Sequence, residues 1–284
     1  MSAVLCKFAA KFVMMNRVRS CVLAFSAVLL SGCSGYNAIL KSTDYDAKYE
    51  LGKNLYVEGK YSNASSILED CVMMLRGTSK GEESVYLLAS CYYQLNDWVM
   101  ASQYYQNYYK TYSKGLYAEE ARFRSGRALY QDTPDPRLDP TSTYGAITEL
   151  QQFLELYPGS RYADEANEMI YAMYDRLVEK EMGTATLYYN LGNYMGNNYQ
   201  AGIITAQNAL KNFPYTKYRE ELSMLILRCK FKMAEESVQD KMLDRYRDTV
   251  DEYYAFKNEF PESKYMKEVE KIYAASVKHT GNLQ

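Results

Sequence analysis

A six-residue motif occurs three times in this chain and constrains its fold more than any other feature. It reads YPGSRY at 157–162, FPYTKY at 213–218 and FPESKY at 260–265. The proline cannot continue a helix and the residue before it avoids the helical region, whereas the Ser or Thr two residues later can cap a following helix. Each copy therefore predicts the end of one helix and the start of the next.

A small residue, or Thr in one case, lies twelve positions before each of these prolines, and the same frame fits two earlier segments. The five frame positions are Ala64, Ala101, Ala146, Gly202 and Thr249. Small side chains at this spacing let paired helices approach closely, as in tetratricopeptide (TPR) repeats. The sequence therefore predicts an all-α TPR solenoid of about five helix pairs plus one extra helix. An irregular helical bundle is the alternative.

The frame positions are unequally spaced, at steps of 37, 45, 56 and 47 residues, whereas a minimal TPR repeats every 34 or so. The second step holds the loop 131–140, whose three prolines forbid a continuous helix. The third step predicts a separate extra helix at about 162–180, and the fourth predicts lengthened helices around 219–240. These departures favour a specialised scaffold over a generic array.

The first 32 residues have the features of a bacterial secretory signal. Four bases and no acid precede the apolar run 21–30, which is too short to span a membrane. The run leads into LSGC at 30–33, which looks like a lipobox. By that resemblance the mature chain begins at Cys33, which carries a diacyl group on sulfur and an acyl chain on its amine. More than one acyl chain anchors a protein stably, and Ser34 favours the outer membrane by analogy with lipoprotein sorting. An ordinary signal with a chance cysteine is the alternative, and Met14 or Met15 is an alternative start.

Charge and composition argue against nucleic-acid binding and catalysis. Without the signal, 29 bases face 35 acids, a net charge of −6 with no basic block. The chain has 31 Tyr but one His, and it lacks a Gly-rich phosphate loop and a Gly-x-Ser-x-Gly motif. His279 is interpreted as a stray surface residue, and acidic pairs such as Glu82-Glu83, Glu119-Glu120 and Glu235-Glu236 as solvating charges on exposed helix faces. We expect no enzyme, no metal and no cofactor apart from the covalent lipid on Cys33.

Three cysteines remain in the predicted mature chain besides Cys33, namely Cys71, Cys91 and Cys229. They cannot all pair within one chain, and no CxxC spacing suggests zinc. Buried free thiols are the favoured interpretation. A Cys71–Cys91 disulfide is the alternative, because the repeat frame puts these two residues on neighbouring helices.

The segment 138–166, which begins LDPT and ends FLELYPGSRYADEA, resembles the BamD family, lipoproteins of the bacterial outer-membrane β-barrel assembly machine. DAKYELGK at 46–53 and GKY at 59–61 resemble the first repeat of that family, and FPESKY at 260–265 resembles its last. The resemblance spans nearly the whole mature chain. The long steps and the tyrosine content suggest a distant, Bacteroidetes-like member.

The resemblance implies an outer-membrane-anchored, periplasm-facing scaffold that acts in the assembly of β-barrel proteins. A TPR array presents a concave groove that binds peptides, and the repeat frame places these residues on it: Tyr49, Lys53, Tyr56, Tyr86, Ser90, Tyr93, Phe123, Arg127 and Tyr130. Aromatics interleaved with Lys53 and Arg127 would receive a peptide that ends in an aromatic residue and a carboxylate, which describes the C-terminal signal of unfolded β-barrel proteins. The alternative is that these tyrosines only pack the superhelix.

The resemblance also implies that the C-terminal repeats, about 183–278, dock on the barrel-forming assembly protein. The expected organisation is a signal peptide (1–32), a lipidated N-terminus and tether (33–43), TPR units one to three (44–160), an extra helix with units four and five (161–278) and a tail (279–284). Two other functions stay open. One is a SusD-like glycan- or nutrient-binding lipoprotein, and the other is a different cell-envelope TPR adaptor.

Overall fold

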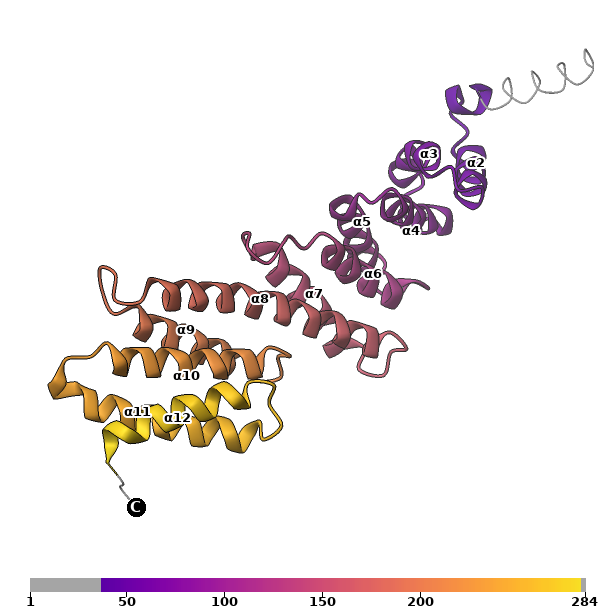
Figure 1. Ribbon diagram of the computed structural model, residues 1–284. Helices are drawn as coiled ribbons and strands as arrows, with labels where there is room; N and C mark the ends of the chain where they lie inside the picture. Colours follow the sequence, from indigo (N-terminus) through magenta and orange to yellow (C-terminus); the bar gives the residue numbers. More distant parts are fainter. Residues whose placement is uncertain (1–36, 282–284) are drawn as a thin grey trace, which may run out of the picture. The chain divides into compact units, whose positions relative to one another are not determined.

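The computed structural model describes residues 37–281, and every regular element in this range is an α-helix (Figure 1). This confirms the all-α prediction. The predicted signal at 1–32, the predicted lipidation site Cys33 and the last three residues of the predicted tail lie outside the described residues. The chain divides into two compact units, Met1–Ser125 and Gly126–Gln284.

The first unit is built from helix pairs that follow one another along the chain. After a helical turn at 37–41 it contains α2 (Tyr45–Val57), α3 (Tyr61–Met74), α4 (Ser79–Gln94), α5 (Trp98–Thr111) and the start of α6 (Ala118–Gln131). Each of the helices α2 to α5 packs on its neighbour in sequence, and α2 also contacts α4. This contact between the first helices of successive pairs is typical of TPR repeats.

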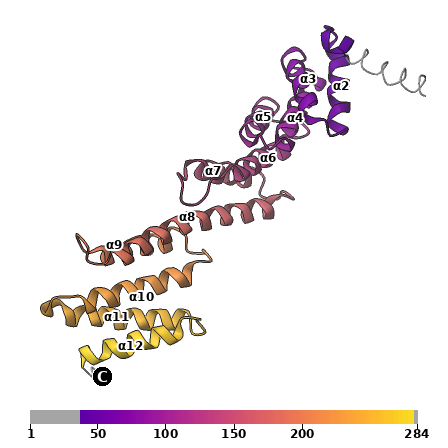
Figure 2. The same ribbon diagram turned by 45° about the horizontal axis from the view of Figure 1, so that its top comes forward.

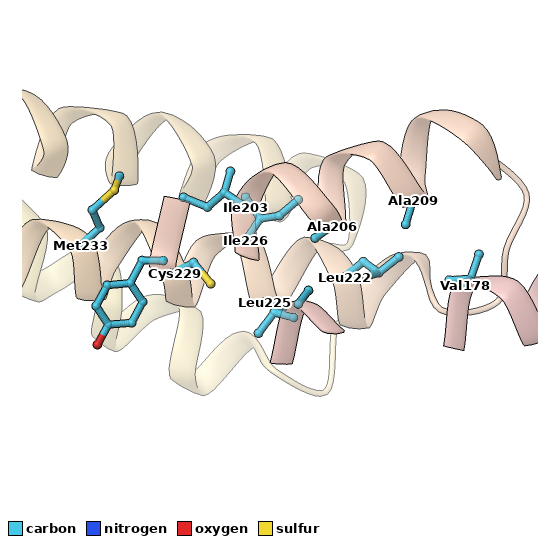
Figure 3. Close-up of a cluster of buried hydrophobic side chains, with 11 residues drawn as sticks. Val178, Ile203, Ala206, Ala209, Leu222, Leu225, Ile226, Cys229 and Met233 are labelled. Carbon is cyan, nitrogen blue, oxygen red and sulfur yellow. The ribbon is translucent and has the colours of Figure 1, made fainter. Parts of the chain in front are cut away.

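The second unit continues the same pattern. Beyond the end of α6 it contains α7 (Thr141–Leu156), α8 (Ala163–Leu191), α9 (Asn198–Asn212), α10 (Arg219–Glu235), α11 (Gln239–Glu259) and α12 (Met266–Thr280). Successive helices from α7 to α12 pack on each other, and α8 contacts α10 as α10 contacts α12 (Figure 2). Figure 3 shows one of its cores, to which α8 contributes Val178, α9 contributes Ile203 and α10 contributes Leu222.

The small residues of the repeat frame lie where helices meet. Ala64, Ala101, Ala146 and Thr249 are fully buried, and Gly202 is buried as well. These positions confirm the close helix contacts that the frame predicts.

The repeated motif forms the same local structure in all three copies. The hydroxyl residue accepts a hydrogen bond from the backbone N–H of the tyrosine two positions later, at 3.1 Å (Ser160), 3.3 Å (Thr216) and 3.0 Å (Ser263). The base lies over the ring of the tyrosine that follows it, at 4.7 Å (Arg161), 5.0 Å (Lys217) and 5.0 Å (Lys264) from the ring centre. The prediction that Ser or Thr caps the next helix is wrong, because the tyrosine itself occupies the N-cap position. The hydroxyl instead orders the turn that precedes the helix.

No separate helix is found at 162–180 within the described residues. This segment is the first part of α8, a single helix of 29 residues whose other half reaches Leu191. Helix α8 contains no proline, and its one glycine, Gly183, weakens a helix by only about 1 kcal/mol. The helix ends at Gly192, which has φ +56°. The unpaired helix of the described chain is α12, after the fifth pair.

Candidate peptide-binding surface

Four of the predicted groove residues are buried. Tyr49, Tyr86, Ser90 and Phe123 are at most 9% exposed, whereas Lys53, Tyr56, Tyr93, Arg127 and Tyr130 are partly accessible. The four buried residues therefore lie on helix faces that neighbouring helices cover, and not on an open groove. Within each unit, only the accessible members can contact a bound peptide directly.

Lys53 lies in a charged cluster that joins α2 to α4. Its ammonium is 2.7 Å from Glu83 Oε1, and the Tyr49 hydroxyl donates to Glu83 Oε2 at 2.5 Å. Burial by itself would raise the pKa of Glu83, but Lys53 and the Tyr49 hydroxyl outweigh burial and hold this pKa below its usual value. Hydrogen bonds to Glu83 and Tyr49 raise the pKa of Lys53. Lys53 is therefore a permanent cation at the surface of the first unit.

Tyr86 lies at the centre of an aromatic cluster between α4, α5 and α6. Its ring stacks on Tyr117 with centroids 4.3 Å apart and meets Tyr105 and Tyr108 edge to face, both at 5.8 Å. Burial raises the pKa of Tyr86 well above its usual value, and that of Tyr105 to about 12, so both hydroxyls are neutral. The Tyr105 hydroxyl forms a 3.0 Å hydrogen bond with buried Ser90.

Arg124 is a cation beside this cluster that the sequence analysis missed. Its guanidinium carbon is 6.0 Å from the centre of the Tyr86 ring, and its Nε donates to Glu120 at 2.7 Å. The side chain is 34% exposed, so it can reach a ligand at the surface. The sequence does contain one signal for Arg124, because it lies four residues after Glu120 and the two can form an ion pair on one helix face. Such pairs are common on solvent-exposed helix faces, so this signal does not single out Arg124.

The half-buried aromatics of the groove prediction also have aromatic neighbours. Tyr56 meets Tyr61 edge to face at 5.6 Å, and Tyr93 meets Trp98 in the same way at 5.0 Å. Both pairs link the first helix of a repeat to its second helix. Of the accessible candidates in the first unit, Lys53 and Tyr56 therefore lie on α2 and Tyr93 lies on α4. Arg124, on α6, is a further accessible cation.

Arg127 and Tyr130 belong to the second unit, and each contacts different residues. Arg127 forms an ion pair of 3.3 Å with Glu165. Tyr130 carries the Arg176 guanidinium 5.2 Å above its ring and lines a pocket of about 620 Å³ between the proline loop and α8. A smaller pocket of about 320 Å³ lies in the first unit, beside Val72, Met73 and Tyr112.

Many tyrosines join two helices through a carboxylate. Their hydroxyls donate to Glu side chains in the pairs Tyr49–Glu83, Tyr92–Glu69, Tyr108–Glu82, Tyr199–Glu236, Tyr218–Glu179 and Tyr253–Glu270. The ring fills the seam between helices while the hydroxyl meets a charged acceptor, which makes a strong hydrogen bond. This pattern supports a packing role for these tyrosines.

The interpretation of the acidic pairs as purely solvating is wrong for several members. Glu82, Glu83 and Glu236 each accept a hydrogen bond from a tyrosine hydroxyl on a different helix. His279 is exposed, as the sequence analysis expects of a surface residue, and its ring stacks on Tyr246 of α11 with ring centres 4.3 Å apart.

The three cysteines of the described chain are buried and free. Burial raises the pKa of Cys71 to about 11 and the pKa of both Cys91 and Cys229 to about 12. This confirms the interpretation as buried thiols over a Cys71–Cys91 disulfide.

Residues 37–281 contain no cluster of His, Cys, Asp and Glu side chains suited to a metal ion. In the same range, no helix is both long and apolar enough to cross a bilayer.

Comparison with known proteins gives one family and one curated relative. The model of the YfiO family, described as an outer membrane lipoprotein, matches residues 42–242. The outer membrane protein assembly factor BamD of Neisseria meningitidis serogroup B (strain ATCC BAA-335 / MC58) is 28% identical over 162 residues, which cover 56% of this chain and 54% of that protein. The chain thus spans about half the length of this relative. Among solved structures, a thermophilic TPR protein of Thermus thermophilus matches 82% of this chain and 99% of its own, at 14% identity and a TM-score of 0.32.

Proposed function

The chain belongs to the YfiO family of outer membrane lipoproteins, and on this basis we propose that it acts in the assembly and insertion of β-barrel proteins in the outer membrane. The observation that carries the proposal is the family match over residues 42–242, which reaches into both compact units. The name of the Neisseria relative, an outer membrane protein assembly factor, agrees with it.

In this proposal the protein is an interaction scaffold without an active site. Cys33 carries the lipid that anchors it in the outer membrane, facing the periplasm. The TPR-like helix pairs present surfaces for other proteins, which is how such repeats usually function.

The first unit would hold peptide signals of unfolded barrel proteins. Lys53 on α2 and Arg124 on α6 offer positive charge on a unit whose helices α2 and α4 also carry the half-buried rings of Tyr56 and Tyr93. A carboxylate that follows an aromatic residue suits a cation next to aromatic surface. The C-terminal repeats, about 183–278, would dock on the barrel-forming assembly protein.

Affinity purification of the tagged full chain from detergent-solubilised outer membranes tests the proposal. We expect the barrel-forming assembly protein to co-purify. Recovery of a glycan transporter in its place would refute the assembly function and favour the SusD-like alternative.

The lipid anchor has a separate test. The Cys33→Ala variant should leave the membrane fraction and appear in the periplasmic fraction, because the acyl chains provide the hydrophobic anchor. Unchanged retention in the membrane fraction would contradict lipidation of Cys33.

A further inference from the structure

One segment of the second unit carries no charge at all. Residues 182–210 contain no Asp, Glu, Lys, Arg or His, although charged residues make up 24% of the chain. The segment comprises the last part of α8, the loop 192–197 and most of α9. Protein surfaces that stay in water are usually charged, whereas the centres of protein interfaces are depleted of charge and enriched in Tyr and Met.

Large apolar side chains of this segment point into solvent. The exposed ones are Leu187, Leu191, Tyr194, Met195 and Ile204. Tyr194 and Met195, at the loop, are 69% and 91% exposed. Exposed apolar side chains are ordinary when scattered singly, but a group within one uncharged segment indicates an interaction site.

The backbone of the loop gives an independent indication. Met195 has φ +54°, and apart from glycines the only other described residue with positive φ is Asn96. Asn adopts this conformation readily, but a bulky residue without a local polar side chain is strained there. No packing offsets this strain, because the Met195 side chain is almost fully exposed. Residues with strained backbone conformations are found preferentially at functional sites.

Hydrogen bonds hold the loop against the next helix pair. The Asn193 side chain donates to Glu236 Oε2 at 2.9 Å, and the Tyr199 hydroxyl donates to Glu236 Oε1 at 2.8 Å. Val238, two residues after Glu236, is also exposed. The α8–α9 loop and the α10–α11 connection, which carries Val238, lie at the same end of the unit in both ribbon views (Figures 1 and 2).

The side chains of residues 187–204 indicate which kind of molecule can bind there. Helices that bind at a lipid surface carry Lys and Arg for the headgroups, and this segment has none. A second copy in a symmetric contact would bring two protruding loops together, and neither pocket described above is lined by a residue of 187–204. A symmetric second copy therefore offers Met195 no recess among the pockets described. Asn and Gln side chains in the segment, such as Asn190 and Gln207, offer hydrogen bonds to peptide groups without charge.

We propose that the edge formed by residues 187–204 is a docking surface for a folded protein with an uncharged, apolar recess that receives Tyr194 and Met195. The inference rests on the proposed function in that the C-terminal repeats have a protein partner. Its new content is the surface and the uncharged character of the contact. Because no ion pairs are involved, high salt should not dissociate the complex.

The test uses the tagged full chain in its own cells, with a photo-reactive phenylalanine analogue at position 194 and, as control, at Leu116. Leu116 is an exposed apolar loop residue of the first unit. The partner cross-linked at 194 is identified by mass spectrometry, and its recovery without cross-linking is measured at about 0.15 M and about 1 M NaCl. We expect one protein partner from position 194, none from 116, and equal recovery at both salt concentrations.

Met195→Gly separates binding from folding. Glycine accepts the positive φ without strain, and this gain roughly offsets its greater freedom in the unfolded chain. The melting temperature should therefore stay within about 2 °C of the wild type, while recovery of the partner falls at least about tenfold. The matched variant Leu116→Gly should keep the partner.

Three results would overturn the inference: full recovery with Met195→Gly, dissociation at high salt, or an adduct at 194 to lipid or to a second copy of the chain. The proposed function is judged separately by the identity of what the wild type recovers. If the barrel-forming assembly protein is recovered equally by wild type and Met195→Gly, only the docking surface is refuted. If the partner lost with Met195→Gly is unrelated to barrel assembly, the surface stands and the proposed function falls.

Discussion

A larger residue at Gly126 should destabilise the protein, although this glycine lies inside a helix. An alanine Cβ at this position would lie 2.5 Å from Leu150 Cδ2 and 2.7 Å from Leu150 Cγ, whereas carbon atoms in good contact are about 3.5–4.0 Å apart. Leu150 is fully buried, so it cannot swing into solvent. Relieving the clash requires a shift of about 1 Å in a packed core.

Two effects of opposite sign decide the outcome of Gly126→Ala. Overpacking of a core typically costs about 1–3 kcal/mol, and alanine regains about 1 kcal/mol of helix propensity. The net loss is on the order of 1 kcal/mol, which lowers the melting temperature of a chain of this size by about 2–4 °C. Circular dichroism at the helix band during heating measures this shift.

Gly145 provides a matched control on the neighbouring helix α7. A Cβ added there has nothing within 4 Å, so Gly145→Ala gains propensity without a clash and should raise the melting temperature by about 2–4 °C. The opposite signs of the two glycine variants test the packing argument.

A double-mutant cycle identifies Leu150 as the cause. Leu150→Ala alone should cost about 2–5 kcal/mol. In that background Gly126→Ala should become neutral or stabilising, because the clashing atoms are gone. The reasoning is refuted if Gly126→Ala stabilises the wild-type chain, or if the two changes simply add.

Two further predictions concern thiols and pH. Because the pKa of Cys71 is raised to about 11 and the pKa values of Cys91 and Cys229 to about 12, native protein at pH 8 should resist iodoacetamide, and all three thiols should react once it is unfolded; mass spectrometry that finds native labelling would contradict their burial. Hydrogen bonds from Arg228 hold the pKa of Glu268 below its unfolded value, so its stabilisation is present above about pH 4.3 and is lost as the pH falls toward the folded pKa. Glu268→Gln should therefore lower the melting temperature at pH 7 more than at pH 3, and an equal shift at both would count against the ion pair.

Several helix boundaries were readable from local signals in the sequence, although the Ser or Thr of the repeated motif does not cap the following helix. A helix ends just before proline at 158, 214 and 261 in each case, and Asp44 and Asp97 cap α2 and α5 through their side chains. Such signals act within a few residues, so they need no knowledge of the fold. The single helix α8 was missed for the same reason, because nothing local distinguishes a 29-residue helix from two shorter ones.

Burial of the candidate site could be predicted only in part. A repeat frame gives the face of a helix on which a residue lies, but the covering of that face depends on the neighbouring pair. Tyr49 and Tyr86 lie on the expected helices and are nevertheless enclosed by contacts from other helices. Arg124 was missed because its interest as a candidate binding residue comes from its position beside Tyr86. Tyr86 is 38 residues away in sequence but close in space.

The tyrosines fall into two groups that composition cannot separate. Those bonded to a glutamate on another helix, such as Tyr49 and Tyr253, have both ring and hydroxyl occupied by the fold. Tyr194 and Tyr215 have exposed rings. A seam tyrosine contributes to stability whether or not a partner is present, whereas an exposed ring gains its packing only from another molecule. Binding by this protein should therefore be sought first at the exposed tyrosines and at Lys53 and Arg124, and loss of a seam tyrosine should be expected to act through folding.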